Sequence, residues 1–118
     1  MPRVLVIEDD EMLGMAISTV LQEKYEVSVF ECPPTTEEMS NQRPDVLLLD
    51  FNAAPGGAVS LVNTVRSSPM LSNLPIVLMS GNHDAIRSDP VLETQCQAFL
   101  AKPFTMDKLS QTIDNMLQ

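Results

Sequence analysis

The chain has 118 residues, 44% of them hydrophobic, and its 16 acidic and 7 basic residues give a formal net charge of -9 at pH 7. This length and composition suit one compact domain, while the negative charge argues against direct binding to nucleic acid or to an anionic membrane. The apolar runs are also far shorter than the roughly 20 residues of a membrane-spanning helix, so we expect one cytoplasmic domain over residues 1–118.

Patterns typical of strands and of helices alternate along the chain. Short apolar runs indicate β-strands, and apolar residues spaced three and four apart indicate amphipathic helices. In chain order, the patterns predict a strand over 4–7, a helix over 13–21, a strand over 27–30, a helix over 35–41, a strand over 46–49, a helix over 58–65, a strand over 76–79, a loop over 82–88, a short helix from Pro90, a strand over 98–101 and a helix over 106–117. Candidate N-caps are Asp10, either Thr35 or Thr36, Asp89 and Thr105.

This alternation of strand and helix, repeated five times, predicts the fold class. It implies a parallel sheet with right-handed crossovers and helices on both faces. The continuous aliphatic runs at 4–7, 46–49 and 76–79 agree with this, because strands of such a sheet are covered on both sides. We therefore predict a three-layer α/β domain.

The cysteines and the histidine indicate neither a set of disulfides nor a zinc site. Cys32 and Cys96 are too few for a set of disulfides, and His83 is the one histidine, so no Cys/His zinc spacing can be assembled. We interpret both cysteines as packing residues.

Polar residues follow four of the predicted strands. In chain order they are Glu8, Asp9 and Asp10, then Asp50, then Ser80, and finally Lys102. Each alone has an ordinary role, such as helix capping for an aspartate. The carboxyl ends of parallel strands, however, share one rim of the sheet, which is where ligands bind. Capping gives no reason for all these residues to gather there, so we interpret them as one site.

Carboxylates a few ångströms apart need a cation. Each pair repels by about 1 to 4 kcal/mol, depending on the effective dielectric. Oxygen ligands without His or Cys suit Mg²⁺, which keeps open positions for phosphate oxygens. The rim therefore indicates phosphoryl chemistry.

The chain resembles the receiver domain of two-component response regulators. It carries the motifs of that family in order and over its whole length, as "VLVIEDDE", "DVLLLDFN", "PIVLMSG" and "AFLAKPF". The resemblance implies a flavodoxin-like fold, a five-stranded parallel sheet with strand order 2-1-3-4-5.

The resemblance also assigns the acidic residues. Asp50 matches the phosphoacceptor, and Glu8 and Asp9 match the acidic pair that holds Mg²⁺ (or Mn²⁺). Asp9 would bind the ion directly and Glu8 largely through water, and the backbone carbonyl of Asn52 matches the remaining ligand. Asp10 lies one position beyond the pair and is better explained as a helix cap.

The remaining motif residues match the phosphoryl contacts and the switch. Ser80 matches the hydroxyl that hydrogen-bonds the phosphoryl group, and Lys102 matches the partner of a phosphoryl oxygen. Phe99 matches the aromatic switch, although the residues alone equally suit a half-buried strand aromatic. The Lys102–Pro103 bond matches a peptide bond that is usually cis.

The resemblance implies a signalling role rather than an enzyme that turns over an external substrate. Its donor would be a sensor histidine kinase or a phosphotransfer protein, and its target an output domain or a protein effector. Phosphorylation would change the surface formed by the helix from Pro90, the strand 98–101 and the helix 106–117, through which receivers commonly signal or form homodimers.

The chain departs from the family pattern in two places. Ala54 stands where proline is usual, with Pro55 one place later, and Ala58 stands where glycine is common. We therefore expect the loop after the third strand to take another path, which bears on the position of the Asn52 carbonyl. Gln95 replaces a frequent glycine, and Pro90 falls within the expected fourth helix. We therefore do not assume the common homodimer.

Two other classes fit less well. A pseudo-receiver, a protein-binding module that takes no phosphate, is disfavoured by the intact Asp9, Asp50, Ser80 and Lys102, but the altered fourth-helix region keeps this alternative open. A flavin protein would need a Ser/Thr/Gly-rich loop after the first strand, and an aspartate phosphatase would need a second acid two positions after Asp50.

Overall fold

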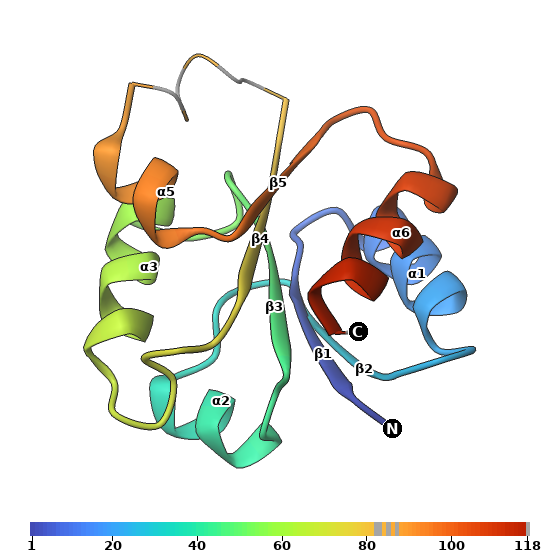
Figure 1. The fold of residues 1–118 in the computed structure, drawn as a ribbon, viewed down its shortest axis with the longest axis horizontal. Coiled ribbons are helices and arrows are strands. Elements are labelled where there is room, and N and C mark those ends of the chain that lie inside the picture. Colours follow the sequence, from blue (N-terminus) through green and yellow to red (C-terminus); the bar gives the residue numbers. More distant parts are fainter. Residues whose placement is uncertain (82–83, 85, 87, 118) are drawn as a thin grey trace.

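The computed structural model describes residues 1–81, 84, 86 and 88–117, and within them one five-stranded sheet in the order β2-β1-β3-β4-β5 (Figure 1). All neighbouring strands are parallel. The elements are β1 Arg3–Ile7, α1 Glu11–Leu21, β2 Glu26–Phe30, α2 Thr36–Gln42, β3 Val46–Asp50, α3 Ala58–Ser67, β4 Ile76–Ser80, α5 Pro90–Gln95, β5 Ala98–Ala101 and α6 Met106–Leu117. The predicted fold class and strand order are confirmed.

Helices cover both faces of the sheet, with α2, α3 and α5 on one side and α1 and α6 on the other (Figure 1). Alternate residues of each central strand enter different cores, as Leu47 and Leu49 pack on the α3 side while Val46 and Leu48 pack on the α1 side. All four are fully buried. This explains the continuous aliphatic runs, because neither face of β1, β3 or β4 meets solvent.

The helix boundaries follow the predicted caps. Asp10 Oδ1 accepts from the Leu13 amide, Thr35 and Glu38 form a capping box, Asp89 caps α5, and Thr105 Oγ1 accepts from the Lys108 amide. In the part of the chain that the structure describes, no helix is long and apolar enough to cross a membrane.

Two sequence expectations are wrong. Within the loop predicted over 82–88, Asp84 and Ile86 are helical, because buried Ile86 packs into the α3-side core; residues 82, 83, 85 and 87, and with them His83, lie outside the described residues. Cys96 is a buried packing residue as expected, whereas Cys32 is exposed after the end of β2.

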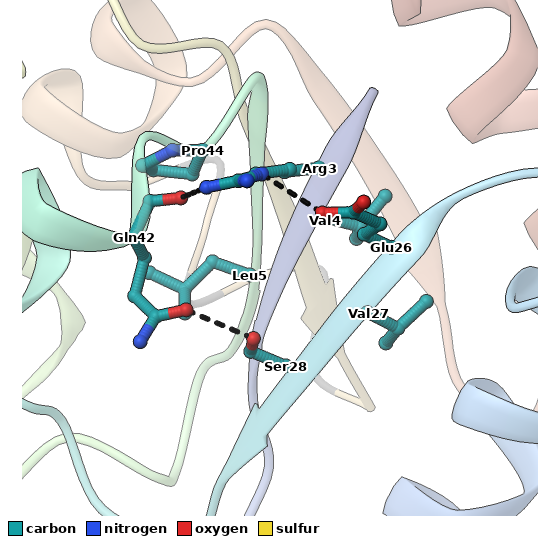
Figure 2. Close-up of a pocket in the computed structure, with 8 residues that line it drawn as sticks. All are labelled: Arg3, Val4, Leu5, Glu26, Val27, Ser28, Gln42 and Pro44. Atoms are coloured by element: carbon teal, nitrogen blue, oxygen red, sulfur yellow. Dashed lines mark hydrogen bonds and ion pairs between the residues drawn. The ribbon is translucent and has the colours of Figure 1, made fainter. Parts of the chain in front are cut away.

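A hollow of about 360 Å³ lies at the amino ends of β1 and β2 (Figure 2). The polar groups around it pair with one another: Arg3 Nε lies 2.9 Å from Glu26 Oε2, and Ser28 Oγ donates to Gln42 Oε1 at 3.0 Å. The hollow lies at the opposite end of the strands from Asp50.

The far end of α6 is tied to the turn between α1 and β2. Asp114 accepts a hydrogen bond from the hydroxyl of Tyr25 and lies 2.9 Å from Lys24 Nζ. These contacts hold the pKa of Asp114 below its usual value, the Tyr25 hydroxyl contributing most. Asp114 therefore stabilises the fold as an anion.

We expect Asp114→Asn to lower the free energy of unfolding at pH 7 by about 1–2 kcal/mol, because a charge-assisted hydrogen bond and an exposed ion pair are lost. The folded pKa is depressed, so the contribution is fully present above pH 3.8, the unfolded value, and is lost as the pH falls through the folded pKa. Urea unfolding from pH 7 to pH 2 measures the difference between variant and wild type.

The matched control is Glu23→Gln, which changes the same charge on an exposed residue of the same turn. A deficit of Asp114→Asn that stayed constant down to pH 2 would contradict the assigned role.

Candidate metal centre

The ends of four strands bring the predicted site residues to one rim. Glu8 and Asp9 follow β1, Asp50 and Ser80 are the last residues of β3 and β4, and Lys102 follows β5. The register explains the convergence, because Ile7 pairs with Leu49, Asp50 with Met79 and Ser80 with Ala101. The strands therefore end at nearly one level, as the sequence analysis predicted.

Three carboxylates meet at this rim. Glu8, Asp9 and Asp50 each offer one oxygen, and these oxygens lie within 4.8 Å of one another. Glu8 is 0% exposed and Asp50 is 2% exposed, whereas Asp9 is open to solvent. The cluster thus has two buried members and one accessible member.

Lys102 bridges the two buried carboxylates. Its Nζ lies 2.8 Å from Glu8 Oε1 and 2.9 Å from Asp50 Oδ1. One ammonium thus faces two buried anions, which leaves the cluster with an excess of negative charge. These contacts were not predicted from the sequence, where Lys102 matched only the partner of a phosphoryl oxygen, because no sequence pattern tells which carboxylate a lysine will reach.

The carboxylates have different affinities for protons. Burial raises the pKa of Glu8, although the Lys102 ammonium and the Asp10 amide oppose it. The hydrogen bond with Glu8 lowers the pKa of Asp9. Burial alone would lower the pKa of Lys102, but Glu8 and Asp50 outweigh it and the pKa is raised. Lys102 is therefore charged at neutral pH.

The donor set fits a hard divalent cation. Asp50 Oδ1 is buried and, apart from its ion pair with Lys102, has no hydrogen-bond partner among the described residues. This oxygen has lost its hydrogen bonds to water, and the Lys102 ammonium replaces only part of them. A bound cation would supply a further contact. Three carboxylates without nitrogen or sulfur ligands match the preference of Mg²⁺. Glu8, Asp9 and Asp50 are thus the residues that could hold it.

The structure also places the other predicted residues. Ser80 is buried, and its carbonyl accepts from the Lys102 amide at 2.9 Å. Asn52 is exposed in the turn after β3, and metal binding by its carbonyl stays a prediction. Phe99 is 37% exposed on β5, so it is more open to solvent than the half-buried strand aromatic that the residues equally suited, and its switch role stays a prediction. The Lys102–Pro103 bond is cis, as expected.

Two glycines shape the loop after β3. Gly56 and Gly57 have φ angles of 83° and 99°, a region that residues with a Cβ rarely adopt. Ala54 is buried, and its carbonyl accepts from the Gly57 amide at 2.9 Å. The unusual sequence of this loop is therefore accommodated by a tight turn that ends at the start of α3.

Comparison with known proteins gives one family. The sequence model of the response regulator receiver domain matches residues 4–114. The TorCAD operon transcriptional regulatory protein TorR of Escherichia coli (strain K12) is 32% identical over 99% of this chain and 51% of its own length. The sensor histidine kinase TmoS of Ectopseudomonas mendocina is 28% identical over 98% of this chain and 12% of its own length. The chain therefore spans about half or less of the length of each of these relatives.

Solved structures share the fold. The chemotaxis response regulator CheY4 of Vibrio cholerae has a TM-score of 0.86 at 22% identity and covers 98% of both chains. The receiver domain of the sensor histidine kinase PA1611 of Pseudomonas aeruginosa PAO1 has a TM-score of 0.85 at 22% identity, over 98% of this chain and 97% of its own, with a magnesium ion in its active site cleft.

We expect Mg²⁺ to bind at the rim and Asp9→Asn to weaken this binding by about tenfold or more, because a direct anionic ligand is lost. Isothermal titration calorimetry with MgCl₂ measures the affinity.

Asp10→Asn is the matched control. This substitution removes the same charge from the residue that follows Asp9. Because asparagine is also a good N-cap, α1 is preserved. Equal weakening in both variants would show that general negative charge, rather than ligation by Asp9, attracts the ion.

Proposed function

Since the chain belongs to the response regulator receiver family, we propose that residues 1–118 form a receiver domain in which Asp50 accepts a phosphoryl group. The donor would be a phosphohistidine on a sensor histidine kinase or a phosphotransfer protein. The reaction would require Mg²⁺ or Mn²⁺ held by Glu8, Asp9, Asp50 and the carbonyl of Asn52.

The observation that carries the proposal is the buried carboxylate of Asp50 between Lys102 and the other two acids. Its Oδ1 lies 2.9 Å from Lys102 Nζ, and its neighbours Glu8 and Asp9 offer oxygens within 4.8 Å. A nucleophile for phosphoryl transfer needs positive charge around it when the phosphoryl group arrives, because that group carries negative charge of its own. Lys102 supplies one such charge from the protein.

The transfer exchanges one bond for another. An oxygen of Asp50 attacks phosphorus, the bond from phosphorus to the donor imidazole nitrogen breaks, and the imidazole leaves with the electron pair of that bond and takes up a proton. The product is an acyl phosphate on Asp50. A bound Mg²⁺ would neutralise charge on the carboxylates and on the phosphoryl oxygens. Lys102 would turn from Asp50 to a phosphoryl oxygen while its contact with Glu8 holds it in place.

The modified aspartate would act as a switch. The phosphoryl group adds negative charge and strong acceptor oxygens at the end of β3. The hydroxyl of Ser80, at the end of the neighbouring strand, would donate to one of them, and Phe99 on β5 would change position in response. The surface of α5, β5 and α6 would then differ between the two states.

This role makes the domain a signalling module. It would assist its own phosphorylation and dephosphorylation without turning over an external substrate. We expect it to act in the cytoplasm. Its output would reach an attached output domain or a protein effector, and a phosphorylation-dependent homodimer is one form of that output. The relatives named above include both a transcriptional regulatory protein and a sensor histidine kinase.

We expect the chain incubated with acetyl phosphate and MgCl₂ to gain the mass of one phosphoryl group, and Asp50→Asn to gain none, because the amide lacks the nucleophilic oxygen anion. Intact-mass spectrometry measures the gain, and trapping of the acyl phosphate with hydroxylamine followed by peptide mapping locates it.

Asp107→Asn, an exposed aspartate in the first turn of α6, is the control and should be phosphorylated like wild type. If wild type and Asp50→Asn both remain unmodified although Mg²⁺ binds, the chain is a pseudo-receiver that acts through protein contacts alone.

A further inference from the structure

Arg66 takes no part in the proposed chemistry, yet its guanidinium makes four hydrogen bonds. It lies in the last turn of α3. Nη1 donates to the carbonyls of Ser72 at 3.2 Å and Leu74 at 2.7 Å, in the connection from α3 to β4. Nη2 donates to the carbonyl of Gln95 at 2.7 Å and to Gln97 Oε1 at 3.0 Å, at the end of α5 and just before β5. One side chain thus joins three separate segments.

Gln97 extends this network into the sheet. The side-chain Oε1 of Gln97 also accepts from the Ile76 backbone amide at 2.7 Å, and the backbone amide of Gln97 donates to the Ile76 carbonyl at 2.9 Å. The position of the Gln97 side chain is set by Arg66 on one side and by Ile76 on the other. The start of β4 is therefore fixed to the segment that enters β5.

The helix α5 needs such support. It has six residues, and a helix of this length is not stable by itself in water. Its amino-terminal end has Asp89 as a cap, with Oδ1 accepting from the Val91 amide at 2.9 Å. In its last turn the carbonyl of Leu92 accepts from the Cys96 backbone amide at 3.2 Å, and the guanidinium of Arg66 donates to the carbonyl of Gln95. A cation at the carboxyl-terminal end also complements the helix dipole.

Arg66 is held by carbonyl oxygens rather than by an acid. No ion pair of Arg66 occurs among the described residues. Burial lowers its pKa, but a guanidinium remains charged at neutral pH. Its removal would therefore leave several carbonyls of partly buried segments without their donor at once.

The direction of the chain decides which end of α5 can respond to Asp50. The chain leaves β4 at the rim that carries Ser80, and α5 then runs back toward the amino ends of the strands, where it meets Arg66 (Figure 1). The amino-terminal end of α5 is thus the end nearer to the rim, and its other end is fixed.

We propose that Arg66 is a positioning residue that anchors the carboxyl-terminal end of α5, so that phosphorylation turns α5 about this end and displaces its amino-terminal end. The anchor concerns the folded protein itself. The turning rests on the proposed function, because it assumes that Asp50 accepts the phosphoryl group.

The first experiment tests the anchor without any ligand. Amide hydrogen exchange, followed by NMR at single residues, compares wild type with Arg66→Met and Arg66→Lys, with the Leu48 amide of β3 as the internal measure of global opening. We expect Arg66→Met to accelerate exchange at Ile76 and Cys96 by about tenfold relative to Leu48, which is the loss of roughly one hydrogen bond.

Two variants keep this experiment decisive. Arg66→Lys retains the charge and should restore part of the protection, and it replaces the methionine variant if that one does not fold. Arg43→Met removes the same charge from an exposed residue and should exchange like wild type. If the exchange rates at Ile76 and Cys96 change by the same factor as the rate at Leu48 in both Arg66 variants, Arg66 does not anchor α5.

The second experiment tests the turning of α5 with BeF₃⁻, which activates one solved receiver domain that shares this fold; MgCl₂ is added with it. In wild type we expect the exchange rate at Val91 to change by about tenfold and those at Ile76 and Cys96 to stay within about twofold. In Arg66→Met all three should change, a difference that loss of stability alone would not produce.

The remaining outcomes are distinguishable. Equal changes at Val91, Cys96 and Ile76 in wild type would overturn the turning while leaving the phosphoacceptor function intact. No response to BeF₃⁻ at any amide would refute the proposed function, and the turning of α5 with it, while the first experiment alone decides whether the anchor is real.

Discussion

The crowding of negative charge at the ends of buried strands is the constraint on which the site depends. Glu8 and Asp50 are removed from water, and Asp9 lies beside them. Their mutual repulsion is balanced in part by one ammonium. Such a cluster is costly unless more positive charge arrives. In the proposed function, relief of this repulsion would be coupled to the binding of a cation and to the arrival of a phosphoryl group at the rim.

The parallel sheet makes this arrangement possible, because it ends several strands at one level. Asp50 and Ser80 belong to neighbouring strands, and Lys102 reaches inward from just beyond β5. The aliphatic runs behind them fill both cores, so the carboxylates rest on a rigid base. At the other end of the molecule, Asp114 of α6 accepts a hydrogen bond from Tyr25, and Arg66 donates to the carbonyl at the end of α5. Polar contacts thus hold α5 and α6 at the end of the sheet opposite the rim.

Much of this could be predicted from the sequence, for identifiable reasons. The strands and the gathering of Glu8, Asp9 and Asp50 follow from local apolar patterns together with the rule for parallel sheets. The helical conformation at Ile86 was missed because it depends on packing against distant residues rather than on a local pattern. The contacts of Lys102 and Arg66 could not be predicted either, since long flexible side chains choose partners only after the chain has folded. The switch role of Phe99 stays a prediction.

The two cysteines differ in a way that is useful for experiments. Cys96 is buried, which raises its pKa to about 11, so its thiol is neutral and shielded at pH 7. Cys32 is exposed, and it lines a hollow together with Ala54 and Pro55 of the loop that follows Asp50. A maleimide dye or nitroxide should therefore attach to Cys32 alone in the native protein, and would place a spectroscopic reporter next to that loop without any engineered substitution.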